Sequence, residues 1–356
     1  MVGSNFFYKT SFLNDKSLKI LRESYNKNKS SQEFFANDNI SKLINKVKLD
    51  ENYHELLMNN NINLIDIFAE NYPSNLKIIE NFPLCFYYKT NLDLSILRKP
   101  KIAIVGSRAP SLANISLTKK LTEFLNNYDF VIVSGLARGI DSIAHEYAKE
   151  TIAVLGASID NIYPSENKLL AHEICNKGAL ISEYPFGTKP LKKNFPMRNR
   201  IIAALADIVI IIEAKINSGS MITAKYALSY NKEILAVPGH PLDYKVAGCN
   251  KLIKEGAYLL DDFREVIEIY NKANPQSFIK IKKDKEESTK NEDFKMSEIE
   301  NKILSLLSEQ PITDEELLRK ININPSDLKQ ILANLELNDF IFMDRYGKIS
   351  RHFTNK

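Results

Sequence analysis

Between residues 101 and 260, short apolar runs alternate with amphipathic segments. The runs are rich in Val and Ile, and helical patterns lie between nearly all of them; they cover 102–105, 130–134, 152–155, 179–182, 208–213 and 234–237. Continuously apolar strands of this kind are typical of a parallel sheet that is covered on both faces. Because strand–helix–strand crossovers are right-handed, the pattern predicts an α/β, doubly wound parallel sheet.

The flanking regions carry different patterns. Residues 1–95 show weak helical periodicity, and their apolar run 84–88 predicts a strand that joins the edge of the following domain. The predicted sheet domain spans 96–268, and the charge-dense segment 269–296 is interpreted as a linker. In residues 297–356, three helical patterns precede a short hairpin, which is typical of a winged helix; they lie at 297–308, 314–320 and 326–338.

The composition narrows the class of protein. The chain has 356 residues, 44% of them hydrophobic, which is enough for two or three domains with sizeable cores. The formal net charge is only +4, so any contact with a polyanion must come from local clustering of basic residues. Cys85, Cys175 and Cys249 are far apart and form no CxxC pair, which favours a reducing compartment and argues against zinc. With no signal-peptide pattern and no apolar run long enough for a bilayer, we expect a cytoplasmic protein without membrane contact.

The loops after the first two strands contain candidate phosphate ligands. In a doubly wound sheet, ligands bind at the carboxyl ends of the strands. The candidates there are Gly106, Ser107 and Arg108 after the first strand, and Gly135, Arg138 and Gly139 after the second. Glycine lets the backbone approach a phosphate, serine donates a hydroxyl bond and arginine a forked pair. The alternative for Arg108 is an ordinary surface arginine after a turn.

Two later loops add further candidates. The segment 189–200 has no acidic residue, and its candidate contacts to phosphates and bases are Lys192, Lys193, Asn194, Phe195, Arg198 and Arg200. Basic groups that follow a backbone, with an aromatic face for a base, are typical of single-strand binding. The alternative is a solvated lysine run beside a core phenylalanine. The small residues Ser218, Gly219 and Ser220 open a helix and suit either a phosphate contact or helix capping.

Signals for catalysis are missing. The chain contains neither GxGxxG nor GxxxxGK[ST], which lowers the expectation of NAD or ATP chemistry. Asp141, Glu183 and Glu213 lie near strand ends, but no nucleophile is paired with a histidine and no carboxylate cluster has metal-binding spacing. His145 has no second ligand at a suitable spacing and is interpreted as structural. We therefore expect binding without catalysis, with no cofactor and no metal.

Taken in order, the motifs resemble one family. They are 104–108 (IVGSR), 134–145 (SGLARGIDSIAH), 162–167 (IYPSEN), 182–185 (SEYP), 194–203 (NFPMRNRIIA), 218–224 (SGSMITA), 236–239 (AVPG) and 248–253 (GCNKLI). Over about residues 72–260, the chain resembles the DprA/Smf family, DNA-processing protein A.

The resemblance implies an extended Rossmann-like domain that binds single-stranded DNA, protects incoming strands and loads the recombinase RecA onto them in natural transformation. It also implies frequent homodimers that act against single-strand-binding protein. The family's DNA pocket would fall on Arg108, residues 134–139, Phe195 with its basic neighbours, and residues 218–220.

The two ends of the chain depart from the family pattern. Many members begin with a glycine-containing, sterile-alpha-motif-like domain, whereas residues 1–70 contain only Gly3, so this region is interpreted as degenerate. In the last winged-helix segment, Lys329 is set against Asp327 and Glu336, which favours a protein contact or an auxiliary role over DNA readout.

The sequence therefore predicts a recombination mediator that binds single strands by charge and stacking. Its arginines and lysines would neutralise phosphates, and Phe195 would stack on a base. The alternative is an enzyme or sensor of the same superfamily that acts on a small nucleotide, with Glu183 or Glu213 recruited as acid or base.

Overall fold

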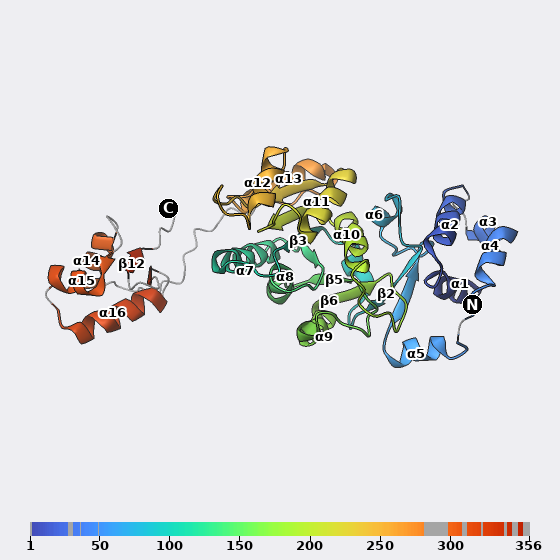
Figure 1. Ribbon diagram of the computed structural model, residues 1–356, viewed down its shortest axis with the longest axis horizontal. Coiled ribbons are helices and arrows are strands. Elements are labelled where there is room, and N and C mark those ends of the chain that lie inside the picture. The colour runs from blue at the N-terminus through green and yellow to red at the C-terminus, as the bar shows by residue number, and fades with distance from the viewer. Residues whose placement is uncertain are drawn as a thin grey trace. The chain divides into compact units, whose positions relative to one another are not determined.

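In the computed structural model, the chain forms two compact units, residues 1–281 and 282–356. The structure describes residues 2–27, 31–35, 37–48, 50–280, 298–307, 312–321, 323–337, 340–343 and 348–351. The first unit contains the sheet and the second the smaller helical domain (Figure 1).

A nine-stranded sheet organises the first unit, with the order β1-β2-β6-β5-β4-β3-β7-β8-β9. The strands are β1 (Asn63–Asp66), β2 (Cys85–Lys89), β3 (Lys101–Gly106), β4 (Val131–Ser134), β5 (Thr151–Leu155), β6 (Gly178–Ser182), β7 (Ile208–Ile212), β8 (Glu233–Ala236) and β9 (Tyr258–Leu259). Strands β3 to β9 pair in parallel, which confirms the predicted doubly wound sheet. The chain runs outward from β3 to β6 and then returns to β7 beside β3, so the order reverses between β3 and β7.

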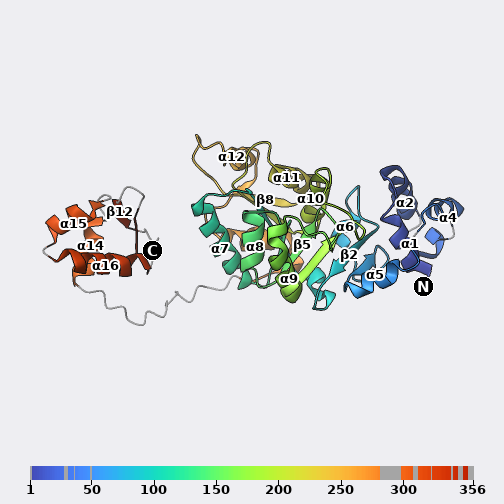
Figure 2. The same cartoon turned by 60° about the horizontal axis from the view of Figure 1, so that its bottom comes forward.

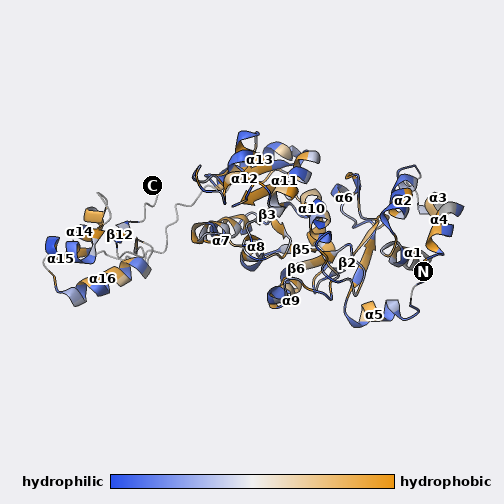
Figure 3. Ribbon diagram, viewed as in Figure 1, coloured by the Kyte–Doolittle hydropathy of each residue, from blue (hydrophilic) through white to orange (hydrophobic). Residues whose placement is uncertain are grey.

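Helices cover both faces of this sheet (Figure 2). They are α7 (Leu112–Asn126), α8 (Ile140–Tyr147), α9 (Lys168–Lys177), α10 (Asn194–Leu205), α11 (Gly219–Ser229), α12 (Ala247–Lys254) and α13 (Arg264–Ala273), with short 3-10 helices at Leu94–Arg98, Ser165–Asn167 and Pro275–Ser277. Alternation along β3 shows the two layers: Ala103 and Val105 share a core with α10 and α11, whereas Ile102 and Ile104 pack with α7, α8 and α13. Figure 3 shows the hydrophobic residues concentrated on the strands between these layers.

The N-terminal helices pack on one edge of the sheet unit. They are α1 (Val2–Thr10), α2 (Asp15–Lys27), α3 (Ser31–Phe35), α4 (Asp38–Ile44), α5 (Tyr53–Asn59) and α6 (Ser74–Lys77). As the apolar run 84–88 predicted, β2 joins the sheet, antiparallel to β6, and β1 pairs antiparallel with β2. Phe7, Phe34 and Ile40 belong to the same core as α10 and α11, so the sheet and its core begin before the domain boundary predicted at residue 96.

The end of the first unit corrects the predicted linker. Helix α13 continues to Ala273, past the predicted linker start at 269. Beyond it, the Asn271 side chain donates to the Ile279 carbonyl and accepts from the Ile279 amide, both at 2.8 Å. These bonds hold residues up to 280 against α13, so they belong to the first unit. The rest of the predicted linker, 281–296, lies outside the described residues.

The second unit has the winged-helix arrangement. It comprises α14 (Glu298–Leu307), β10 (Ile312–Thr313), α15 (Asp314–Lys320), α16 (Pro325–Leu337), β11 (Ile341–Met343) and β12 (Lys348–Arg351). The strand order is β10-β12-β11, and Thr313 starts α15 with a capping box to Glu316. The predicted hairpin is thus present as β11 and β12; its turn, 344–347, lies outside the described residues. Over the described part of both units, no helix has the length and hydropathy of a membrane span.

Candidate nucleic-acid interface

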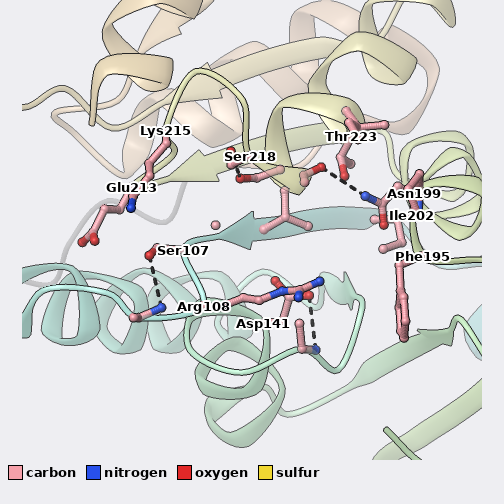
Figure 4. Close-up of a pocket in the computed structure, with 18 of the residues that line it drawn as sticks. Ser107, Arg108, Asp141, Phe195, Asn199, Ile202, Glu213, Lys215, Ser218 and Thr223 are labelled. Atoms are coloured by element: carbon pink, nitrogen blue, oxygen red, sulfur yellow. Dashed lines mark hydrogen bonds between the residues drawn. The ribbon is translucent and has the colours of Figure 1, made fainter. Parts of the chain in front are cut away.

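A cavity of about 750 Å³ opens where the strand order reverses, at the carboxyl ends of β3 and β7 (Figure 4). This is the place where doubly wound folds bind their ligands. Its walls come from the β3–α7 loop, the β7–α11 loop and the first turns of α10. The predicted site residues that line it are Gly106, Ser107, Arg108, Lys192, Phe195, Arg198, Ser218, Gly219 and Ser220. The structure therefore brings most of the candidate loops to one cavity.

Arg108 supplies a positive charge to the cavity. Its side chain is exposed and extends across the cavity, below Ser218 in Figure 4. Among the described residues it has neither an ion pair nor a hydrogen-bond partner, so its guanidinium is free to bind an anion. The backbone before it is fixed: the Ser107 amide donates to the Ile212 carbonyl at 3.2 Å, and a Cβ at Gly106 would clash with that same oxygen.

Arg198 has a different role from the one predicted. Its guanidinium is buried and donates to the carbonyls of Gly135, at 2.7 Å, and Val154. Burial lowers its pKa to about 10, against the opposing effect of Asp141. The Asp141 carboxylate accepts from the Gly135 amide at 3.1 Å, and burial raises its pKa. Arg198 and Asp141 thus hold the loop after β4 in place, which corrects the expectation that Arg198 is a free phosphate ligand.

Two aromatic rings form one end of the cavity. Phe195 is half-buried at the start of α10, and Tyr163 is exposed with its ring centroid 5.4 Å from that of Phe195. Gly156 lies behind Phe195, and a Cβ there would come within 2.7 Å of the ring. A smaller adjoining pocket is lined by Gly135 and Arg138 together with these two rings. Phe195 is therefore placed between the core and the cavity, where a base can reach its edge or face.

Two helix N-termini meet at the cavity and differ in what occupies them. At α7, the Glu213 carboxylate accepts from the Ser111 amide at 2.7 Å and from the Asn114 side chain at 2.8 Å. At α11, the Ser218 hydroxyl does not cap the helix but bonds the Ser220 hydroxyl at 2.9 Å. The capping alternative for Ser218 is thus not what the structure shows. The positive end of α11 faces the cavity, whereas that of α7 already holds a carboxylate.

Four predicted residues lie outside both pockets. Gly139 has φ +74°, and a Cβ there would clash with the Ser107 carbonyl, so it shapes the neighbouring loop. Lys193 is exposed just before α10, and Asn194 is buried. Arg200 is buried, with its Nη2 2.5 Å from Glu183 Oε2. This interior ion pair corrects the prediction that Arg200 contacts a phosphate.

Arg138 is exposed but has a partner. Its Nη2 donates to Glu166 Oε2 at 2.7 Å, and both side chains are about half exposed. A surface pair of this kind is weak enough for a phosphate to compete with it. Arg138 therefore stays a proposed DNA contact, at the edge of the smaller pocket.

His145 is structural, as its spacing predicted. It is buried, accepts from the Leu136 amide at 3.3 Å through Nε2, and bonds the Thr151 hydroxyl at 2.6 Å through Nδ1. Burial lowers its pKa to about 3, so the ring is neutral at physiological pH. The three cysteines are buried and free. In the described part of the chain, no three His, Cys, Asp or Glu side chains are grouped as metal ligands.

Several cavity residues were not identified from the sequence. These are Asn199, Lys215, Thr223, Tyr244 and Lys245, along with Tyr163 as an aromatic partner. Asn199 follows Phe195 by four residues on α10, a spacing that places both on one helix face. Recognising that helix would have identified Asn199. No local pattern marks the others: Thr223 lies on α11, and the rest come from loops.

Comparison with known proteins agrees with the order of these loops. The family model for DNA recombination-mediator protein A matches residues 63–271, more than half of the chain, and the model for the DprA winged-helix domain matches 287–342. The chain belongs to the DprA/Smf family. The DprA resemblance seen in the sequence is thus confirmed, together with the Rossmann-like fold and the winged helix.

Individual DprA proteins show how far the likeness extends. The chain is 45% identical to DNA processing protein DprA of Streptococcus pneumoniae over 56% of this chain and 72% of that protein, and 40% identical to that of Bacillus subtilis over 60% and 73%. The X-ray structure of the S. pneumoniae DprA matches with a TM-score of 0.63 and 35% identity, over 74% of this chain and 97% of that one. A Helicobacter pylori DprA structure, described as showing a unique single-stranded DNA binding mode, matches with a TM-score of 0.55 and 34% identity, over 59% and 96%.

Proposed function

We propose that the cavity between β3 and β7 binds single-stranded DNA without reading its sequence. The observation that carries this proposal is the Arg108 guanidinium, which has no partner among the described residues and lies between the N-terminus of α11 and the aromatic edge formed by Phe195 and Tyr163. Free positive charge suits a phosphate, and exposed aromatic faces suit any base. The H. pylori relative supports the proposal, because its structure is described by its single-stranded DNA binding mode.

The contacts of the three candidate carboxylates favour binding over catalysis. Asp141 accepts backbone amides, Glu183 is paired with Arg200, and Glu213 accepts from Ser111 and Asn114. Asp141 and Glu183 are thus held by backbone and ion-pair contacts, and Glu213 uses Oε2 to hold the start of α7. Glu213 Oε1 is buried and has no hydrogen-bond partner among the described residues, so only Glu213 keeps an oxygen that the small-nucleotide alternative could use. The mononucleotide alternative is disfavoured for a second reason: Glu213 occupies the N-terminus of α7, where dinucleotide folds bind phosphate.

Within that function we also propose the roles that family membership brings. The protein would protect incoming strands, act against single-strand-binding protein, and load RecA in natural transformation. It would do so as a cytoplasmic homodimer, with the winged helix in an auxiliary or protein-contacting role. Membership of the DprA/Smf family supports each of these statements.

Arg108→Ala is expected to weaken the binding of a labelled oligothymidine and to flatten its salt dependence. Each phosphate contact on a single strand contributes about 0.7 to the slope of log K against log salt, so the variant's slope should be smaller by about that amount. Fluorescence anisotropy across a salt series measures both quantities. Lys120→Ala is the matched control, because Lys120 is exposed on α7 and lies outside the cavity.

Equal slopes for wild type and Arg108→Ala would contradict the assignment of Arg108 to a phosphate. Thymidine monophosphate, added as a competitor in the same assay, distinguishes the alternative function. If an equal concentration of the mononucleotide displaces the oligothymidine, the result would favour an enzyme or sensor that acts on a small nucleotide.

A further inference from the structure

The end of the cavity opposite Phe195 carries a second aromatic side chain that family membership does not explain. Tyr244 and Lys245, in the loop between β8 and α12, line the cavity together with Lys215 from the β7–α11 loop. Figure 4 shows Lys215 and Phe195 at opposite ends. Because Lys215 Nζ lies 4.6 Å from the centroid of the Tyr244 ring, Tyr244 belongs to the Lys215 end.

The Tyr244 ring is available to a ligand. The residue is 64% exposed, and among the described residues its one recorded side-chain contact is the cation–π contact with Lys215. An ammonium over one face leaves the other face open. It also holds the ring in place, which reduces the conformational freedom lost when a base stacks on it. A tyrosine kept exposed and oriented beside two lysines has the chemistry of a base-stacking position with phosphate contacts next to it.

The groups between the two aromatic ends suit a sugar–phosphate backbone. Arg108 reaches into the middle of the cavity, and Ser218 at the N-terminus of α11 lies above it (Figure 4). Ser220 lines the same cavity. Lys192 stands at the Phe195 end and Lys245 at the Tyr244 end, so positive charge is present along the whole route. Glu213 also lines the cavity, and its Oε2 accepts from the Ser111 amide and the Asn114 side chain at the start of α7.

We propose that Tyr244 is a second stacking platform, and that one unpaired strand crosses the cavity from Phe195 and Tyr163 to Tyr244. This inference rests on the proposed single-strand function and adds its minimal ligand: a strand longer than a dinucleotide, with bases of any identity, that stacks one base on each platform and places the intervening phosphates on Arg108 and the start of α11. A mononucleotide engages only one of the two platforms.

The test compares Tyr244→Ala with wild type on a long oligothymidine and on the thymidine dinucleotide. Loss of one base–aromatic stack lowers affinity by about 5- to 150-fold, and this loss is expected for the long oligothymidine. Tyr244→Phe keeps the ring and should bind as wild type does. Leu242→Ala is the control for the loop, because Leu242 is 88% exposed in the same segment and does not line the cavity. For the dinucleotide, which is too short to span both ends, Tyr244→Ala is expected to have a much smaller effect.

The possible outcomes distinguish the second stacking platform from the single-strand binding on which it rests. If Phe195→Ala loses affinity for the long oligothymidine but Tyr244→Ala binds it as wild type does, the second platform is overturned. The proposed single-strand binding would then still stand. An equal loss in Leu242→Ala would also overturn the second platform, because the effect would then belong to the loop and not to the ring. Absence of binding by wild type would overturn both proposals together.

Discussion

Replacing Glu183 by alanine is expected to lower the free energy of unfolding of the first unit by about 3–5 kcal/mol, the cost of leaving a buried charge without its partner. Glu183 Oε2 lies 2.5 Å from Arg200 Nη2, and Arg22 Nη2 lies 3.8 Å from Glu183 Oε1. The Arg200 side chain is only 3% exposed. Without Glu183, two cations face each other in the interior, and Arg200 keeps Nε and Nη1 without hydrogen-bond partners.

The same substitution connects stability to the site. Arg200 lies on α10, five residues beyond Phe195, and Arg22 lies on α2 of the N-terminal region. Glu183 therefore joins the N-terminal helices to the helix that carries Phe195. This gives the N-terminal region, whose role the sequence left open, a physical one: it helps to fix α10 in place.

Glu166→Ala is the matched control, because Glu166 also pairs with an arginine, Arg138, but on the surface. Its loss is expected to cost less than about 1 kcal/mol. Urea unfolding followed by circular dichroism measures both variants, with the transition of the winged-helix unit expected to stay unchanged. If Glu183→Ala and Glu166→Ala lower the free energy of unfolding equally, this prediction is contradicted, because burial of the Glu183–Arg200 pair would then add nothing to its contribution to stability.

Phe195→Ala is expected to reduce the affinity for a long oligothymidine by about 5- to 150-fold, the effect of removing one base–aromatic stack. The ring is half-buried, lies at the cavity end beside Tyr163, and is backed by Gly156. Binding is measured by fluorescence anisotropy on protein whose circular dichroism spectrum matches wild type.

Phe195→Leu separates stacking from packing. Leucine fills much of the same space but has no aromatic face, so it should bind as weakly as Phe195→Ala, whereas Phe195→Tyr should bind as wild type does. Wild-type affinity in Phe195→Leu would mean that the ring supports the fold and does not stack on a base.

The fold was predictable because its signal is local and repeated. Apolar runs such as 102–105 and 208–213 give strands, and parallel strands place their carboxyl ends at one edge of the sheet. Arg108 and residues 218–220 were identified as candidates because each follows such a strand, the family resemblance joined them in one pocket, and the structure places both in one cavity.

The roles of the basic residues after Lys192 were harder to predict, because they depend on α10. The segment was read as a loop, but the helix begins at Asn194, so successive side chains turn by about 100°. Arg198 and Arg200, two positions apart, therefore leave opposite sides of α10: Arg198 reaches the loop after β4, and Arg200 reaches Glu183. Tyr244 had no periodic pattern around it, and its place opposite Phe195 follows only from the tertiary arrangement.

Ultraviolet cross-linking of the full chain to an oligothymidine, followed by mass spectrometry of the linked peptides, tests the central claim most directly. We predict cross-links in the peptides that carry Tyr163 and Phe195, reduced by Arg108→Ala and by high salt. Cross-links confined to the winged-helix unit, residues 282–356, or to parts of the first unit away from the β3–β7 cavity, would contradict the account.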